Sequence, residues 1–397
     1  LAVIKVHVLF LPSWYPTNSN DIRGSFFREQ ALAIANTVCK VGVIAPELRS
    51  LRRPIAALKS SHGIHRENDG SIVTLRAFSP NLTPRLLSLN TWRIRHLTRH
   101  LYDAYTAHEG RPDLIHVHSA LPAGVGALDI KRRLGVPFVL SEHSSAYARQ
   151  LVGREGRALS RNIALEASER YAVSTQFAGL LDEALKMPTQ SFSIMPNMVD
   201  GAFLKHAITP RTLGHFNFLH ISTLDKNKNV PALLQAFAKK YHGRADVSLT
   251  IAGDGPARAA LEQLAKKLGI FNEVSFLGRL SRSGVITALS TCDAFVLPSR
   301  YETFGVVLVE ALAMGVPVIA TRCGGPEDIV TDANGLLVPV DDVDSLAMAM
   351  KRLHDSRTHY DPALIRENCR ARFGPEAVSK KWHDIYTRVA ADKFLTH

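Results

Sequence analysis

Two glutamates and the backbone between them have the spacing of a binding site for a phosphate-containing ligand. Glu302 precedes the segment Val306–Met314, whose apolar spacing predicts a helix, and Glu310 lies about two turns further on. Backbone N–H groups at a helix start are unpaired donors at the positive end of the helix dipole, so they suit an anion. The amides expected in this position belong to Thr303, Phe304 and Gly305. Carboxylates on either side of an anion suit hydroxyl groups, and a nucleotide sugar has that layout.

Short apolar runs that alternate with helical patterns predict the framework that must hold this loop. Ala294–Leu297 and Val316–Ala320 are typical of buried strands on either side of the loop and helix. Ile4–Leu11 and Val38–Ala45 are typical of the first two strands of the chain. Because the alternation continues through both halves, we expect an α/β fold with two Rossmann-like, doubly wound parallel sheets that face a cleft.

The domain boundary is expected where this periodicity weakens. Residues 201–214 lack a clear period and contain Pro210. We therefore expect an N-terminal domain over residues 1–205 and a C-terminal domain over residues 206–376. Residues 377–397 form a last helical segment with Trp382 on its apolar side.

Histidines stand at two strand ends in the N-terminal half. His116 and His118 alternate with Val117 in a strand-like run, so both point to one face, with His118 near the carboxyl edge. His143 follows another predicted strand, Val136–Leu140. The carboxyl edge is where open α/β sheets bind ligands, so His118 and His143 are candidate site residues. The alternatives are a core histidine for His118 and a structural role for His143.

We expect no metal at these positions. His-x-His is compatible with a metal pair, but no third ligand lies nearby in the sequence. Asp342 and Asp344 match an Asp-x-Asp motif, but they precede a predicted helix over Ser345–Leu353, where acidic residues serve as caps.

The C-terminal stretch resembles a known family of enzymes. Glu302 and Glu310, with seven residues between them, resemble the E-x7-E signature of retaining glycosyltransferases of the GT-B fold. The segments Pro298–Gly305 and Gly324–Glu327 resemble family 4 of those enzymes, the glycosyltransferase group 1 type. The resemblance covers the C-terminal half strongly and the N-terminal half through strand-end motifs only. It implies a metal-independent hexosyltransferase without a cofactor, which uses a nucleoside-diphosphate sugar as its donor.

The resemblance also implies roles for residues around the donor. Lys228 stands where the family has a lysine that neutralises the pyrophosphate, and Thr223 stands where the family has an arginine. A lone lysine that is simply solvated is the alternative for Lys228. The remaining donor-side candidates are Glu302 at the transferred sugar, Glu310 at the ribose, the amides of residues 303–305 at the diphosphate, and Gly278 and Arg279 near the base.

The acceptor side is matched more weakly. Family members have a glycine-rich acceptor loop after the first strand, whereas this chain offers only Gly24 there. The resemblance places His118 beside the transferred sugar, and it leaves Gly24 and His143 as acceptor-side candidates. The catalytic candidates are therefore His118, Lys228 and Glu302. The resemblance also implies that the last helix crosses back to the first domain.

The charge is basic and unevenly distributed. The chain of 397 residues has a formal net charge of +12, and residues 1–199 carry 24 Lys and Arg against 15 Asp and Glu. One cluster is Arg49–Arg53 with Lys59, and another, Arg85–His100, mixes arginines with Leu, Trp and Ile. Peripheral contact with an anionic membrane is one interpretation of this composition, and a solvated basic helix face is the other.

The compartment is predicted from the cysteines and from the first strand. The four cysteines show no metal-ligand spacing, which favours reduced, mostly buried thiols in a cytoplasmic protein. No small-residue cleavage pattern follows the first apolar run, so we predict no signal peptide. We expect a cytoplasmic enzyme, with contact to the inner face of the cell membrane as an option.

These observations predict a retaining glycosyltransferase of bacterial-type polysaccharide or glycolipid synthesis. We favour a UDP-sugar as the donor, with GDP-mannose next, and a saccharide or a lipid-linked saccharide as the acceptor. A nucleotide-sugar epimerase on the same fold is an alternative, whereas a phosphorylase would need a pyridoxal lysine motif that we do not find. A basic nucleic-acid-binding protein is a further alternative, although no nucleic-acid-binding signature is present and no nucleic-acid partner is expected.

Overall fold

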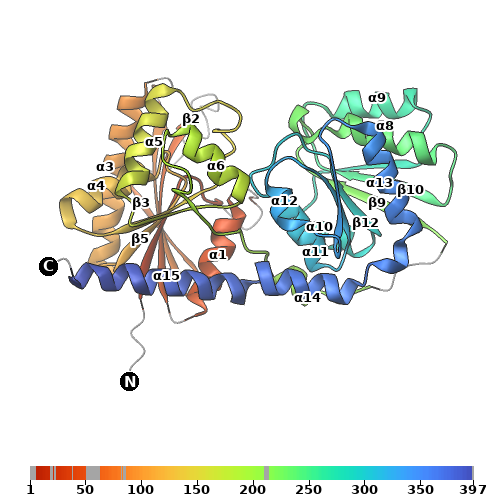
Figure 1. Ribbon diagram of the computed structural model, residues 1–397. Coiled ribbons are helices and arrows are strands. Elements are labelled where there is room, and N and C mark those ends of the chain that lie inside the picture. The colour runs from red at the N-terminus through yellow and green to blue at the C-terminus, as the bar shows by residue number, and fades with distance from the viewer. Residues whose placement is uncertain are drawn as a thin grey trace. The chain divides into compact units, whose positions relative to one another are not determined.

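The computed structural model describes residues 6–17, 21, 24–37, 39–50, 63–81, 83, 86–209 and 214–395. The chain divides into two compact units, each built on one α/β sheet (Figure 1). Unit 1 contains residues 1–196 and 378–397, and unit 2 contains residues 197–377. The α/β class and the two doubly wound sheets expected from the sequence are confirmed.

The boundary differs from the predicted one at residue 205. Residues 197–205 pack with unit 2, because the Val199 N–H donates to the Phe373 carbonyl at 2.9 Å and Asp200 forms an ion pair with Arg282. Periodicity could not show this, because both contacts join segments far apart in the sequence.

The sheet of unit 1 has eight strands in the order β3-β4-β2-β1-β5-β6-β7-β8. Their bounds are β1 His7–Pro12, β2 Lys40–Ser50, β3 Ile64–Asp69, β4 Ile72–Asn81, β5 Leu114–His118, β6 Phe138–Glu142, β7 Glu169–Ala172 and β8 Ser193–Ile194. All residues of β1, β5 and β6 are buried, as expected for central parallel strands covered on both faces. Edge strand β3 pairs antiparallel with β4 and is largely exposed.

Two predicted strands have different bounds in the structure. β1 begins at His7 rather than Ile4, and Ile4 lies outside the described residues. β2 begins at Lys40 and continues through Ser50, well past the predicted end at Ala45, because it pairs with β4 as far as Asn81. Arg49 belongs to this extension, whereas the rest of the first basic cluster lies outside the described residues.

Helices of unit 1 cover both faces of the sheet, and α4 packs against α3 and α5. Their bounds are α1 Ser25–Ala35, α3 Leu87–Glu109, α4 Gly124–Leu134, α5 Arg154–Glu166, α6 Thr175–Ala184 and α15 Pro375–Leu395, of which residues from 378 onward belong to this unit.

The sheet of unit 2 has six parallel strands in the order β11-β10-β9-β12-β13-β14. The strands are β9 Phe216–Ile221, β10 Val247–Ala252, β11 Val274–Gly278, β12 Ala294–Leu297, β13 Val318–Thr321 and β14 Gly335–Val338. The α-helices are α7 Gly201–Lys205, α8 Val230–Tyr241, α9 Arg258–Lys267, α10 Arg282–Ser290, α11 Val306–Ala313, α12 Gly325–Ile329, α13 Val343–Asp355 and α14 Pro362–Phe373. Two 3₁₀ turns complete the unit, η1 Lys226–Lys228 and η2 Arg357–His359.

The C-terminal part of α15 completes the core of unit 1. Trp382 is 2% exposed, and its ring contacts those of His116 and Tyr171 and stacks on Tyr386. The Tyr386 hydroxyl lies 2.6 Å from His116 Nδ1. The apolar side predicted for the last helix is therefore buried, and it braces the strand that carries His118.

No helix within the described part of the chain combines the length and the apolar character that a membrane crossing requires.

Trp382→Ala tests the role of α15. Removing a fully buried aromatic ring costs about 3–5 kcal/mol, so we expect a lower calorimetric transition temperature for unit 1. The adjacent Lys381 is exposed, and Lys381→Ala is the matched control. A Trp382→Ala loss no larger than that of the control would show that the helix does not stabilise the unit.

Candidate active site

The strand order of each sheet marks one place where loops diverge. In open α/β sheets, ligands bind outside the carboxyl ends of the strands at the point where the order reverses. This point lies between β9 and β12 in unit 2 and between β1 and β5 in unit 1. Lys228 and Glu302 follow β9 and β12, whereas Gly24 and His118 lie at the ends of the β1 loop and of β5.

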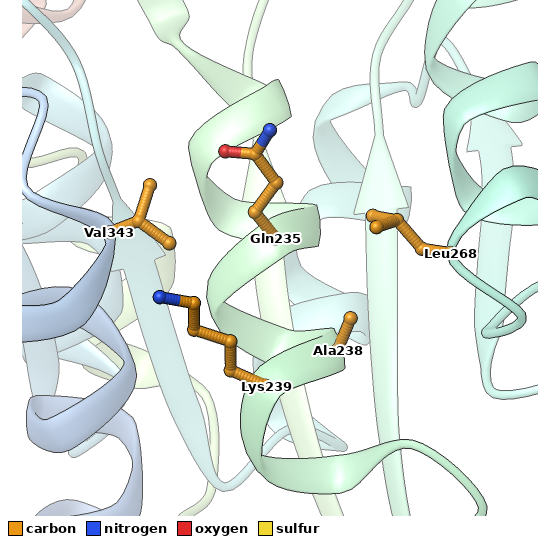
Figure 2. Close-up of a pocket in the computed structure, with 5 residues that line it drawn as sticks. All are labelled: Gln235, Ala238, Lys239, Leu268 and Val343. Carbon is orange, nitrogen blue, oxygen red and sulfur yellow. The ribbon is translucent and has the colours of Figure 1, made fainter.

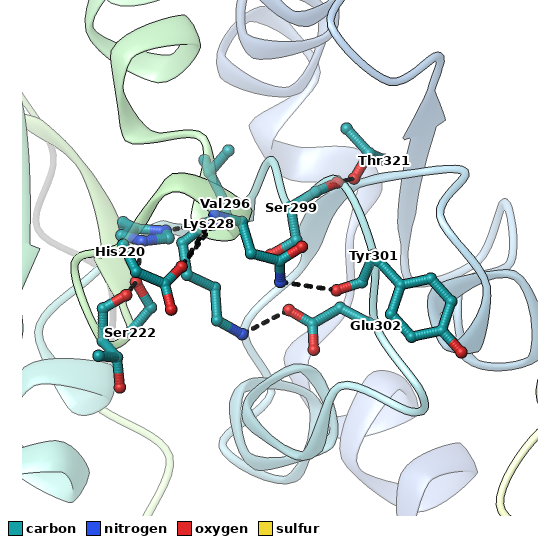
Figure 3. A network of polar contacts seen from close by, with 11 residues as sticks. His220, Ser222, Lys228, Val296, Ser299, Tyr301, Glu302 and Thr321 are labelled. Carbon is teal, nitrogen blue, oxygen red and sulfur yellow. Dashed lines mark hydrogen bonds and ion pairs between the residues drawn. The ribbon is translucent and has the colours of Figure 1, made fainter. Parts of the chain in front are cut away.

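Lys228 and Glu302 form an ion pair at the reversal point of unit 2. Lys228 Nζ lies 2.6 Å from Glu302 Oε1, and the two side chains are 22% and 13% exposed (Figure 3). Asp225 accepts from the amides of Asn227 and Lys228 and so caps η1, while Asn227 Nδ2 donates to the Tyr301 carbonyl at 2.9 Å. The ion pair and the Asn227 bond tie the two loops together, although each joins residues 74 positions apart.

His220 links β9 to β12 inside the sheet. Its Nδ1 lies 2.8 Å from the Val296 carbonyl oxygen and its Nε2 lies 2.7 Å from Ser222 Oγ (Figure 3). Burial lowers the pKa of His220 to about 4, so the ring is neutral near pH 7. His220 therefore supports the loops without adding charge to the site.

The loop after Glu302 is held by a second backbone segment. Glu302 pairs with Gly324, and the Gly325 N–H donates to the Glu302 carbonyl at 2.9 Å. A Cβ at Gly325 would lie 2.2 Å from the Cα of Phe304, so only glycine allows this approach. The Phe304 ring is buried against Phe373, which leaves the backbone of this residue as the part able to meet a ligand.

The helix begins where the sequence predicts. α11 starts at Val306, and Gly305 is its N-cap with φ 98°, so residues 303–305 form the loop before the helix. The left-handed φ of Gly305 turns the chain sharply into the helix, which a side chain would disfavour. Among the described residues, the amides of Phe304 and Gly305 donate to no backbone carbonyl. They are therefore free to bind an anion.

Glu310 lies on α11 and is paired. Its side chain is 9% exposed, and Oε1 accepts from Arg282 Nη1 at 2.5 Å. Burial raises the pKa of Glu310, and Arg282 opposes that rise. Arg282 also forms an ion pair with Asp200 at 3.3 Å. Sequence reasoning missed both Arg282 and Asp200, although an arginine at the start of a helix, where acids are favoured, was an available signal.

Two of the other predicted donor residues are more exposed. The Thr223 and Arg279 side chains are exposed, as is Lys226, and Gly278 ends β11 with φ 71°. The structure brings Lys228 and Glu302 into contact. It shows no such contact for Thr223, Gly278 or Arg279 among the described residues, so their predicted roles stay predictions.

In unit 1 the predicted histidines lie together. His118 Nδ1 lies 3.4 Å from His143 Nε2, and the Phe27 ring contacts both imidazoles at centroid distances of 4.5 and 4.9 Å. His118 Nε2 is buried and has no hydrogen-bond partner among the described residues. Gly24 is the N-cap of α1, the helix that carries Phe27.

Glu142 holds the loops around these histidines. Its carboxylate accepts from the amides of Ala120, His143 and Ser144 at 2.8–2.9 Å. Burial raises the pKa of Glu142, while the three N–H donors oppose the rise. Glu142 is the last residue of β6, and because its partners are backbone groups, the sequence pattern does not reveal this role.

A shallow depression of about 490 Å³ lies on the outside of unit 2 (Figure 2). It is lined by Gln235, Ala238, Lys239, Leu268 and Val343. Lys239 is paired with Asp344 at 2.5 Å. The depression is mostly apolar and holds none of the strand-end residues, so it is not the candidate site.

The Asp342–Asp344 motif serves as a helix cap in the structure. Asp342 accepts from the Ser345 amide at 2.9 Å and caps α13, as predicted from the sequence. Over the described ranges, no three His, Cys, Asp or Glu side chains cluster as a metal site would require. The four cysteines form no disulfide within the described part of the chain and are buried, in keeping with the predicted reduced, mostly buried thiols.

Comparisons with known proteins agree with this fold. Residues 205–372 match the family described as glycosyl transferases group 1, and residues 26–203 match the one described as glycosyltransferase family 4. N-acetyl-alpha-D-glucosaminyl L-malate synthase of Bacillus anthracis is 29% identical over 83% of this chain and 90% of its own length.

Solved structures share the architecture. Sucrose-phosphate synthase from Thermosynechococcus elongatus superposes with a TM-score of 0.76 at 19% identity, over 98% of this chain and 100% of that one. HepE of Anabaena, in complex with UDP and glucose, gives 0.71 at 18% identity, over 96% and 100%. The fold is thus that of the GT-B glycosyltransferases. The chain belongs to glycosyltransferase family 4, the group 1 type, and the epimerase and nucleic-acid-binding alternatives are set aside.

His118 is predicted to be neutral throughout the physiological range. Burial lowers the pKa of His118 well below its usual value, and the neighbouring imidazoles lower it further. The unfolded chain binds a proton near pH 6.5 and the folded one does not, so stability should fall as the pH drops below about 6.5.

Nitrogen-15 NMR of labelled imidazoles can test this, with His118→Gln to assign the signal. We expect the folded His118 to stay neutral at pH values at which the imidazoles of the urea-unfolded protein are already protonated. Titration of the folded His118 near the midpoint shown by the urea-unfolded protein would contradict the burial argument.

Proposed function

We propose that the protein is a retaining, metal-independent hexosyltransferase that moves a sugar from a nucleoside-diphosphate sugar to a saccharide or lipid-linked acceptor. A UDP-sugar is the favoured donor and GDP-mannose the next. The observation that carries the proposal is the Lys228–Glu302 pair at the reversal point of the unit 2 sheet, next to two unpaired amides. The complex of HepE with UDP and glucose supports a uridine donor on the same fold.

The donor would be held in three parts. Lys228 and the amides of residues 303–305 would bind the diphosphate, and Glu302 would accept hydroxyl groups of the transferred sugar. Glu310 would accept the ribose hydroxyls, and Gly278 and Arg279 would lie near the base. Because Thr223 supplies no charge where the family has an arginine, Lys226 and Arg279 are the candidates for a second cation; both side chains are exposed and able to move.

The reaction would pass through a loose transition state in which charge builds on the diphosphate. The bond from the anomeric carbon to the phosphate oxygen breaks, and a bond to the acceptor oxygen forms on the same face. The leaving phosphate takes the acceptor proton. Lys228 and the amides would stabilise the departing charge, which is the largest contribution a preorganised site can make. Neutral His118 would contact the transferred sugar, and His143 and Gly24 would lie on the acceptor side.

Lys228→Ala tests the diphosphate assignment. Removing one preorganised cation should lower kcat by about 10²- to 10³-fold with the preferred donor. A thermal-shift screen with UDP, GDP and ADP identifies the base first, and turnover is then measured with and without EDTA. Lys240→Ala, which removes an exposed lysine on α8 of the same unit, is the control. Unchanged turnover in the Lys228 variant, or activity abolished by EDTA, would refute this scheme.

We also propose that α3 contacts an anionic membrane surface on the cytoplasmic side. Leu86, Leu89 and Trp92 are 51%, 43% and 60% exposed and recur every three residues at the start of the helix. No acidic residue occurs between residues 86 and 102. Arg95 and Arg99 share the single carboxylate of Asp129, so this surface keeps an excess of positive charge. Exposed apolar side chains among arginines suit the interface of an anionic bilayer.

Trp92→Glu tests the membrane contact by co-sedimentation with phosphatidylglycerol vesicles. Loss of one buried apolar side chain and addition of a negative charge should weaken binding about tenfold or more. Leu364, 53% exposed in unit 2, provides the control Leu364→Glu. If wild type does not bind the vesicles, or if both variants bind equally, α3 is only a solvated basic helix.

A further inference from the structure

Arg282 connects two carboxylates that come from different parts of unit 2. Its Nη1 lies 2.5 Å from Glu310 Oε1 on α11, and its Nη2 lies 3.3 Å from Asp200 Oδ2, just before α7. The guanidinium also lies over the Phe203 ring, 4.5 Å from its centroid. Contacts on three sides fix the plane of this group, which a fork-shaped guanidinium makes possible.

Glu310 depends on this contact for its charge. The carboxylate is almost completely buried, and an isolated buried carboxylate becomes neutral rather than remain charged. Burial raises the pKa of Glu310, Arg282 lowers it, and the charge of Asp200 raises it. Among the described residues, Arg282 is the cation within ion-pair distance of Glu310.

Other charged groups near α11 do not replace Arg282. On α14, Arg366 donates to the Ala313 carbonyl and Cys369 to the Val309 carbonyl, so both engage the helix backbone. On α12, Glu327 lies 3.9 Å from Arg322. Arg282 of α10 and Asp200 before α7 are the groups that act on the Glu310 carboxylate itself.

We propose that Arg282 is a positioning residue for nucleotide binding: it keeps Glu310 ionised and points its second oxygen toward the ribose. The inference rests on the proposed role of Glu310 at the ribose. An ionised carboxylate accepts two hydroxyl donors, whereas a protonated one has weaker acceptors and a donor of its own. Arg282 also ties this carboxylate to Asp200, near the point where unit 2 begins, so the same contact orders the first residues of the unit.

A solely structural role makes a different prediction. If Arg282 only joined α7, α10 and α11, its removal would weaken every nucleotide alike and at every pH. If it positions Glu310, the loss appears only for ligands with ribose hydroxyls, and it grows as the pH falls.

The test is calorimetric titration of UDP and of 2′,3′-dideoxy-UDP between pH 6 and 8, with wild type and Arg282→Gln. If the thermal-shift screen prefers another base, the corresponding pair of nucleotides is used. The terminal phosphate titrates in this range in both nucleotides, so the pH dependence considered for each protein is that of the ratio of the UDP to the dideoxy-UDP affinity. For wild type, we expect this ratio to change little with pH. For Arg282→Gln, we expect a UDP affinity about tenfold weaker at pH 8 and weaker still at pH 6, because the pKa of Glu310 rises without its cation. The dideoxy nucleotide should bind both proteins equally.

Three further proteins make the result decisive. Arg282→Lys should restore the flat pH profile in part, since it returns the charge without the fork. Arg244→Gln, which breaks an exposed pair with Asp246, is the matched control and should behave as wild type. Glu310→Gln tests the ribose role separately: unchanged UDP affinity there refutes that role whatever Arg282 does. If Glu310→Gln does weaken UDP binding, two results for Arg282→Gln would overturn the proposal for Arg282. One is a ratio of UDP to dideoxy-UDP affinity that does not change with pH, and the other is an equal loss of affinity for both nucleotides.

Discussion

The ion pair between Lys228 and Glu302 is the contact on which the rest of the candidate site depends. Two partly buried charges lose hydration, and such a pair persists only where geometry and further hydrogen bonds compensate. The structure supplies that compensation through the Asp225 cap and the bond from Asn227 to the Tyr301 carbonyl. The close approach of Gly325 to Phe304 holds the second loop in place. The diphosphate of a bound nucleotide sugar would contact Lys228, and its sugar hydroxyls would contact Glu302. The pair therefore suits a ligand with an anion and hydroxyl groups side by side.

The two units have different kinds of side chain in their candidate sites. Unit 2 has charged side chains that form ion pairs, Lys228 with Glu302 and Arg282 with Glu310. Unit 1 buries its histidines, and burial lowers the pKa of His118 so that the imidazole stays neutral. Charged groups suit a donor whose leaving group is a diphosphate, whereas neutral imidazoles suit contacts with sugar hydroxyls. This division follows from the side chains at two equivalent places in two similar sheets.

Much of this arrangement could be predicted from the sequence. The strands around Glu302 were predictable because buried parallel strands are short apolar runs, and Glu302 and His118 because they stand at the ends of such runs. Glu310 was predictable from its place on the predicted helix, whereas Lys228 came from the family resemblance. The contact between Lys228 and Glu302 was not predictable, because it depends on β9 and β12 becoming neighbours. Arg282 and Asp200 were missed for the same reason. The extension of β2 to Ser50 was hidden because Pro46, Glu47 and Arg49 interrupt the apolar pattern, although pairing with β4 continues.

The central claim is that unit 2 holds an activated sugar by its diphosphate at the reversal point of its sheet. The most direct test is a crystal structure of the protein with an unhydrolysable analogue of the donor nucleotide sugar. The account predicts diphosphate oxygens within hydrogen-bond distance of Lys228 Nζ and of the Gly305 amide, with the sugar at Glu302 and the ribose at Glu310. A well-ordered analogue with its diphosphate bound away from both loops would contradict it.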